Sequence, residues 1–206
     1  MSTLDEATLI ARMCAQVPGP PSPAGPGDDA AVEGGRVTTV DLMVEGVHFL
    51  RAHPPAWLGH KLLAVNLSDV GAMGAVPEGF VLTAALPEET PLEWWDALAF
   101  GVGRLAREAG VALVGGDITR SPGPVMLGVT AWGQVGPAGA LQRKGGRPDD
   151  LLMLHSVQGV GRSACGLARW LTQAAEAWGA APPDEAEPCL RAHLRPETSW
   201  RQGPWA

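Results

Sequence analysis

Four acidic residues have the types and neighbours needed for metal and phosphate chemistry. They are Asp29, Asp41, Asp69 and Asp117, in the segments GDD, TVD, NLSD and GGD. Three of these segments are expected at strand ends or loop mouths, where functional groups gather. Carboxylates from separate elements suit Mg²⁺, which in turn bridges phosphate oxygens. For any one segment taken alone, a plain turn is the simpler interpretation.

Asp69 is the hardest of the four to explain as a simple turn or surface residue. It lies in the run LLAVNLSDVGAMGA, residues 62–75, which predicts a buried helix. An ionised carboxylate on an apolar helix face is unfavourable unless something pairs with it. Asn66, three residues earlier on the same face, is one candidate partner through a hydrogen bond. A metal ion is the other, and the residues alone leave both open.

The surrounding sequence predicts alternating strands and helices. Helices are predicted over 3–16, 57–73, 91–109 and 163–178, and strands over 37–44, 80–86, 111–114, 125–135 and 151–157. Thr3 and Thr90 are the expected N-caps of the first and third helices, because each has a glutamate three residues later. This alternation indicates an α+β or α/β domain that ends near Gly136. A polar connector and a second, unfinished-looking domain follow.

Composition excludes several classes of function. The 206 residues are 46% hydrophobic with a net charge of −7, so nucleic acid, which usually needs a basic face, is not an expected partner. No apolar run reaches membrane-spanning length. The three cysteines form no CxxC motif, which favours a reduced, cytoplasmic setting over a zinc or disulfide framework. No GxxxxGK[ST] phosphate loop is present either.

Six segments, taken in order, carry a resemblance to a known family. They are GDDAAV (27–32), TTVDLMVEGVHF (38–49), HKLLAVNLSDVGAMGAVP (60–77), LVGGDITR (113–120), LQRKGGRPDD (141–150) and HLRP (193–196). Together they resemble the thiamine-monophosphate kinases, within the ATP-binding superfamily of aminoimidazole-ribonucleotide synthetase. The resemblance implies a mixed-sheet N-terminal domain with flanking helices over 1–137, which binds metal and phosphate and forms a dimer barrel. It also implies an incomplete C-terminal α/β domain over 138–206.

The resemblance further implies a reaction and a role for each matching residue. The family transfers the γ-phosphoryl group of ATP to thiamine monophosphate, giving thiamine diphosphate, with several Mg²⁺ ions and no side-chain nucleophile. The implied Mg²⁺ ligands are Asp29, Thr39, Asp41, Asp69 and Asp117. The implied ATP contacts are Gly116, Asp117 and Arg143, and His48 is the implied contact to thiamine monophosphate. ATP is then the co-substrate of a cytoplasmic homodimer.

The chain also departs from the family pattern. Val40 replaces a hydroxyl residue, and Ala99-Phe100 stands where the family often has a tyrosine near the nucleotide. The family's later Asp-Gly-Leu and Gly-Gly-Glu-Asp motifs are absent, so we expect a fragment, a frameshifted product or a decayed copy. Two alternatives stay open: another ATP-dependent synthetase or maturation factor of the superfamily, and a non-catalytic dimerising module that binds Mg²⁺-nucleotide.

Overall fold

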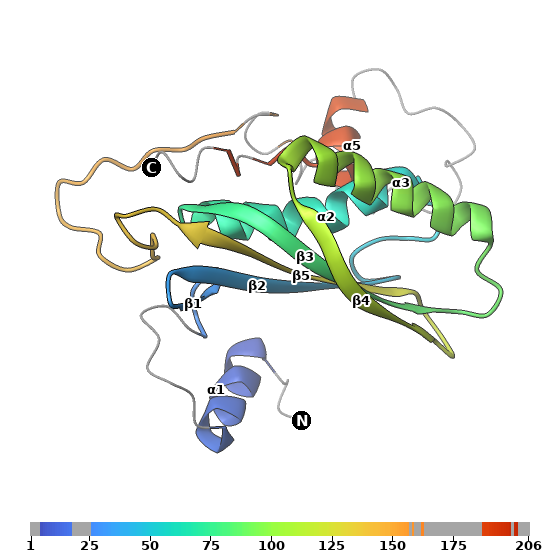
Figure 1. Ribbon diagram of the computed structural model, residues 1–206, viewed down its shortest axis with the longest axis horizontal. Coiled ribbons are helices and arrows are strands. Elements are labelled where there is room, and N and C mark those ends of the chain that lie inside the picture. Colours follow the sequence, from blue (N-terminus) through green and yellow to red (C-terminus); the bar gives the residue numbers. More distant parts are fainter. Residues whose placement is uncertain are drawn as a thin grey trace.

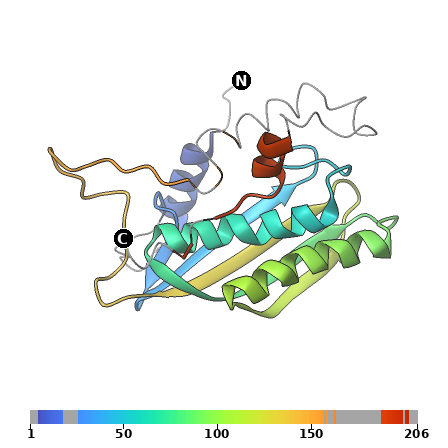
Figure 2. The ribbon, with the colours of Figure 1, turned by 90° about the horizontal axis from the view of Figure 1, so that it is seen from above.

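The computed structural model describes residues 5–17, 26–156, 158, 162, 187–198, 200 and 201. Within them a five-stranded sheet carries helices α2 and α3 side by side on one face, while α1 lies on the opposite side (Figures 1 and 2). The helices are α1 (Glu6–Gln16), α2 (Pro55–Ala72), α3 (Leu92–Ala109) and α5 (Glu187–Leu194). The strands are β1 (Ala31–Glu33), β2 (Arg36–Val44), β3 (Ala75–Leu86), β4 (Ala112–Arg120) and β5 (Met126–Val135).

The sheet is mixed, and its strand order is β1-β2-β5-β3-β4. Only β3 and β4 run parallel, because α3 connects them, and the other neighbouring pairs are antiparallel. Strand β2 pairs with β5 along its whole length, from Arg36 opposite Gln134 to Val44 opposite Met126. The arrangement therefore has β2 near one edge of the sheet and β4 at the other.

Helix α2 lies at the centre of the fold and is apolar on most of its surface. It packs against β2, β5 and β3 on one side and against α3 and α5 on others. Leu62, Leu63 and Val70 are fully buried there. The two long helices also approach closely, because a side chain at Gly59 would overlap the Leu98 carbonyl oxygen. This tight packing holds Asp69, near the end of α2, in a fixed position over the sheet.

The mixed sheet with flanking helices confirms the predicted fold class, and two predicted helix caps are wrong. Helix α1 begins at Glu6, where the Asp5 carboxylate accepts a hydrogen bond of 2.9 Å from the backbone N–H of Thr8. Helix α3 has Pro91 at its N-cap, without the predicted side-chain bond from Thr90. Gly110 ends α3 in a left-handed conformation, as predicted. No helix in the described ranges is long and apolar enough to cross a membrane.

Several boundaries differ from the sequence prediction. Strand β1 and helix α5 were not predicted. Strand β4 continues through Gly-Gly-Asp to Arg120 rather than stopping at Val114. The apolar run Leu151–Leu154, predicted as a strand, is exposed and has no regular structure. It has no neighbouring strand among the described residues, which a strand needs in order to form. The predicted helix over 163–178 lies outside them.

Candidate functional site

Asp69 finds a hydrogen-bond partner on the sheet rather than on its own helix. The Thr39 hydroxyl donates a hydrogen bond of 2.9 Å to Oδ2 of Asp69. The prediction that Asn66 could be this partner is wrong, because its amide donates to the Leu62 carbonyl oxygen at 3.1 Å. A hydroxyl group satisfies one carboxylate oxygen but leaves the negative charge unneutralised.

Asp29 and Asp41 lie near the Thr39–Asp69 hydrogen bond. We call Asp29, Thr39, Asp41 and Asp69 the acidic cluster. The Thr39 hydroxyl lies 3.3 Å from the Asp29 carbonyl oxygen. Asp41 follows Thr39 by two residues, so both side chains leave β2 on the face that α2 covers. A loop, a strand and a helix therefore each contribute oxygen atoms to one region of the molecule.

The charges in the acidic cluster are not balanced within it. Burial raises the pKa of Asp69 to about 6, the Thr39 hydrogen bond opposes this rise, and the neighbouring Asp41 and Asp29 carboxylates add to it. Burial also raises the pKa of Asp41, against the influence of nearby His48. Repulsion between buried carboxylates is relieved when a cation binds between them.

Arg143 and His48 lie beside the acidic cluster. Arg143 forms an ion pair with Asp29, and its backbone N–H lies 3.4 Å from both carboxylate oxygens of Asp28. His48 follows β2, where its Nδ1 accepts a hydrogen bond of 3.0 Å from the backbone N–H of Val44. That bond leaves Nε2 as the imidazole N–H donor that can meet an anionic ligand.

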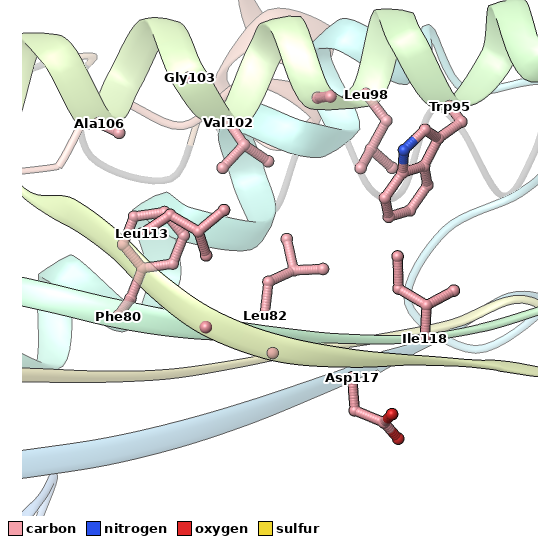
Figure 3. A pocket seen from close by; sticks show the side chains of 13 residues that line it. Phe80, Leu82, Trp95, Leu98, Val102, Gly103, Ala106, Leu113, Asp117 and Ile118 are labelled. Carbon is pink, nitrogen blue, oxygen red and sulfur yellow. The ribbon is translucent and has the colours of Figure 1, made fainter.

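Asp117 and Gly116 are not part of the acidic cluster within one copy of the chain. They lie on β4, which β3 and β5 separate from β2. Three strand spacings correspond to about 14 Å. Figure 3 also shows the Asp117 side chain leaving β4 on the side of the sheet away from α3. A side chain at Gly116 would overlap the Leu82 carbonyl oxygen, so close pairing with β3 requires glycine there.

The oxygen donors of the acidic cluster fit Mg²⁺ that is bound together with phosphate. Within the described part of the chain, no three acidic, histidine or cysteine side chains converge closely enough to hold an ion by themselves. Mg²⁺ in nucleotide sites uses one or two carboxylates, with water and phosphate oxygens completing its shell. Asp69, Asp41 and the Thr39 hydroxyl provide donors of this kind.

A second feature, which sequence reasoning missed, is an apolar pocket of about 410 Å³ between α3 and β4. Phe80, Leu82 and Trp95 line it together with the backbone of Gly115 and Gly116 (Figure 3). The register of β3 and β4 shifts between Phe80 and Val81, a distortion often found near functional sites. Small residues on α3 leave the space open, and their spacing (Ala99, Gly103 and Ala106) is the signal available in the sequence.

Comparison with known proteins identifies the class. Residues 27–135 match the family described as AIR synthase related protein, N-terminal domain, and the chain belongs to this family. Its curated relatives include thiamine-monophosphate kinases. The kinase from Synechococcus elongatus is 39% identical over 152 residues, which are 70% of this chain and 46% of the relative. That from Escherichia coli K12 is 33% identical over 165 residues, which are 80% of this chain and 48% of the relative.

Solved structures agree with this assignment. Thiamine monophosphate kinase from Aquifex aeolicus superimposes with a TM-score of 0.83 at 26% identity, covering 97% of this chain and 63% of the other. AaThiL complexed with AMPPCP and TMP gives a TM-score of 0.79 at 28% identity, covering 96% of this chain and 61% of that one. The chain spans about half the length of the curated relatives it matches.

Proposed function

We propose that this chain acts in the ATP-dependent phosphorylation of thiamine monophosphate to thiamine diphosphate, in the cytoplasm. Its relatives carry the name of this kinase, and a related structure is described with AMPPCP and TMP. The observation that carries the proposal is the environment of Asp69. Its carboxylate is held on a buried helix, hydrogen-bonded to Thr39, and two further carboxylates raise its pKa.

The chemistry of the acidic cluster suits this reaction. Transfer of a phosphoryl group between two anionic phosphates requires mainly charge neutralisation and alignment. Mg²⁺, when bound, supplies the positive charge that both phosphates need. Asp69, Asp41 and Asp29, with Thr39, would hold these ions. Because the acceptor phosphate oxygen is already anionic, no side-chain nucleophile is required.

The neighbouring residues would bind and orient the two substrates. The Arg143 guanidinium, beside Asp29, can contact the phosphates of ATP. The His48 N–H, near Asp41, can contact thiamine monophosphate. A homodimer is part of the proposal. Asp117 and Gly116 remain candidate ATP contacts from β4.

Two measurements on the same preparation test the proposal. Calorimetry with AMPPCP and Mg²⁺ measures binding, and thiamine diphosphate formation from ATP and thiamine monophosphate measures turnover. We expect Asp69→Asn to weaken Mg²⁺-nucleotide binding by about tenfold or more and to lower turnover by about 100-fold or more. Asp96→Asn, an exposed change of the same kind on α3, is the matched control. Binding by the wild type without any turnover would favour a non-catalytic nucleotide-binding module instead.

A further inference from the structure

The segment that joins β2 to α2 contains a short loop, residues 45–51, which carries His48. Strand β2 ends at Val44, and the chain turns back at Gly46, whose φ of +82° lies in the left-handed region that favours glycine. The Gly46 N–H donates a hydrogen bond of 2.7 Å to the Phe49 carbonyl oxygen, and the His48 N–H donates one of 2.9 Å to the Val44 carbonyl oxygen. Phe49 is fully buried in the core, so packing fixes one side of the loop.

An ion pair joins the two ends of this loop. The Arg51 guanidinium donates two hydrogen bonds to the Glu45 carboxylate, from Nε to Oε1 at 2.9 Å and from Nη2 to Oε2 at 2.8 Å. Paired bonds of this kind fix the orientation of the two groups as well as their separation. The Glu45 side chain is only 19% exposed. Arg51 lowers the pKa of Glu45 against the effect of burial, so the carboxylate is ionised at neutral pH.

The sheet and helix α3 hold the ion pair from two further directions. Oε2 of Glu45 also accepts a hydrogen bond of 2.9 Å from the backbone N–H of Val125, the residue before β5. The Arg51 guanidinium lies over the ring of Trp94, in the first turn of α3, with its carbon 5.6 Å from the ring centre. The Thr90 hydroxyl lies 3.5 Å from Nη1 of Arg51. The ends of the loop are therefore fixed to two elements that belong to the rigid part of the fold.

The imidazole of His48 depends on this closed loop for its orientation. His48 is exposed, so packing does not hold its ring. Its Nδ1 instead accepts the hydrogen bond of 3.0 Å from the Val44 N–H, which places the imidazole proton on Nε2. This bond requires the loop to bring the ring back to the end of β2, and the loop is closed by Glu45 and Arg51.

We propose that Glu45 and Arg51 are positioning residues for His48. Their ion pair closes the loop and so keeps the Nε2–H donor of His48 in one orientation, ready for the phosphate of the substrate. Neither residue has to touch the substrate, because both act through the loop. A donor that is oriented in advance binds an anion without the entropic cost of ordering it first. This inference rests on the proposed function, in which His48 contacts thiamine monophosphate.

The orientation of His48 can be measured without any substrate. At about pH 8.5, where histidine is ordinarily neutral, the ¹⁵N chemical shifts of the imidazole distinguish a fixed tautomer from a mixture. We expect the Nε2–H tautomer for His48 in the wild type, and in Arg51→Ala and Glu45→Gln a shift toward the values of a free imidazole. Arg36→Ala is the matched control, since it removes an exposed ion pair with Glu78 from the same strand, and it should change nothing. Wild-type His48 signals in both loop variants would overturn the proposal.

Ligand binding tests whether Arg51 acts through His48. Calorimetry with thiamine monophosphate, in the presence of AMPPCP and Mg²⁺, should show binding weakened by about tenfold in Arg51→Ala. AMPPCP affinity should stay within about twofold of the wild type, because the nucleotide does not use this loop. The double variant with His48→Ala should bind thiamine monophosphate no more weakly than His48→Ala alone. Arg51→Lys, which keeps the charge but loses the paired bonds, should recover only part of the loss.

The contrary outcomes distinguish this inference from the proposed function. Additive losses in the double variant would overturn the inference, because Arg51 would then act independently of His48. Equal losses of thiamine monophosphate and AMPPCP affinity, together with a lower melting temperature, would give the ion pair a purely structural role and also overturn it. A wild-type chain that binds no thiamine monophosphate would remove the proposed function. The NMR comparison would still decide in that case whether Glu45 and Arg51 hold His48.

Discussion

The surroundings of Asp69 destabilise its ionised carboxylate. Its carboxylate is partly buried on α2. Burial raises its pKa, and two other carboxylates raise the pKa further. Such an arrangement is unfavourable for folding alone and is typical of sites where a ligand supplies the missing charge. This environment is the reason we propose that Asp69 serves ligand binding rather than packing.

The pH dependence of the free energy of unfolding should reveal this destabilisation of Asp69. The pKa of Asp69 is raised to about 6, so the folded state holds a proton that the unfolded state releases near pH 4. The contribution to stability is therefore fully present below about pH 4 and is lost as the pH rises through about 6. In metal-free buffer, Asp69→Asn should remove this loss and stabilise the chain at pH 7 by up to about 1 kcal/mol, allowing for solvent screening. Urea unfolding at several pH values measures it, and an unchanged or lower stability at pH 7 would contradict the interpretation.

Two histidines near α5, His53 and His193, should give stability the opposite pH dependence. Burial is the main cause that lowers the pKa of His53 to about 3 and of His193 to about 4, and Lys61 adds to both shifts. Because their folded pKa values are depressed, the stability they allow is present above about pH 6.5 and is lost as the pH falls toward these values. We expect the chain to lose stability between about pH 6 and pH 4. Histidine signals that titrate normally in NMR spectra would contradict this expectation.

At the scale of elements, the contact between α2 and α3 holds the site in place. Side chains at Gly59 and Gly101 would overlap the carbonyl oxygens of Leu98 and Ala56, respectively. We expect Gly59→Ala or Gly101→Ala to lower the free energy of unfolding by about 1–3 kcal/mol. Gly103→Ala is the matched control, since only the end of the Arg107 side chain lies near, and it should be neutral or stabilising by up to about 1 kcal/mol. Equal effects at all three positions in thermal unfolding would show that the helices do not depend on this approach.

The sequence allowed some elements to be predicted and concealed others. Strand β2 and helices α2 and α3 follow from local hydrophobic patterns, so their positions were predicted within a few residues. Strand β1 is only three residues long, and its short pattern carries little signal. The Gly-Gly-Asp segment resembles a turn, yet it is a strand because β3 provides a parallel partner far away in the sequence.

The candidate site was likewise predictable only in part. Acidic residues with small neighbours, ordered as in a known family, indicated Asp29, Asp41, Asp69 and Asp117 as a group. Within one copy of the chain Asp117 lies on β4, apart from the other three. The hydrogen bond from Thr39 to Asp69 depends on tertiary packing. The pocket between α3 and β4 also depends on it, and the small residues on α3 are its only trace in the sequence. The distance between β4 and the acidic cluster also follows from strand order alone.

At the scale of the whole molecule, the described residues leave both sheet edges, and apolar side chains on one sheet face, exposed in a single copy. Exposed Val40, Leu42 and Ile118 lie on the strands concerned. We expect Leu42→Asp to shift the chain toward the monomer in sedimentation equilibrium, because it places a charge on the face that a second copy would bury. Leu92→Asp, at an exposed position on α3, is the control and should leave association unchanged. A dimer of unaltered affinity in Leu42→Asp would place the interface elsewhere.

The most direct single test is to locate the bound metal-nucleotide by NMR. Mn²⁺ replaces Mg²⁺ in the presence of AMPPCP, and its paramagnetism broadens the signals of nearby nuclei. We predict selective loss of the backbone signals of Asp29, Thr39 and Asp69, with α1 signals unchanged. Preserved signals at these three positions, with broadening confined to another surface, would contradict the assignment of phosphate and metal binding to the acidic cluster.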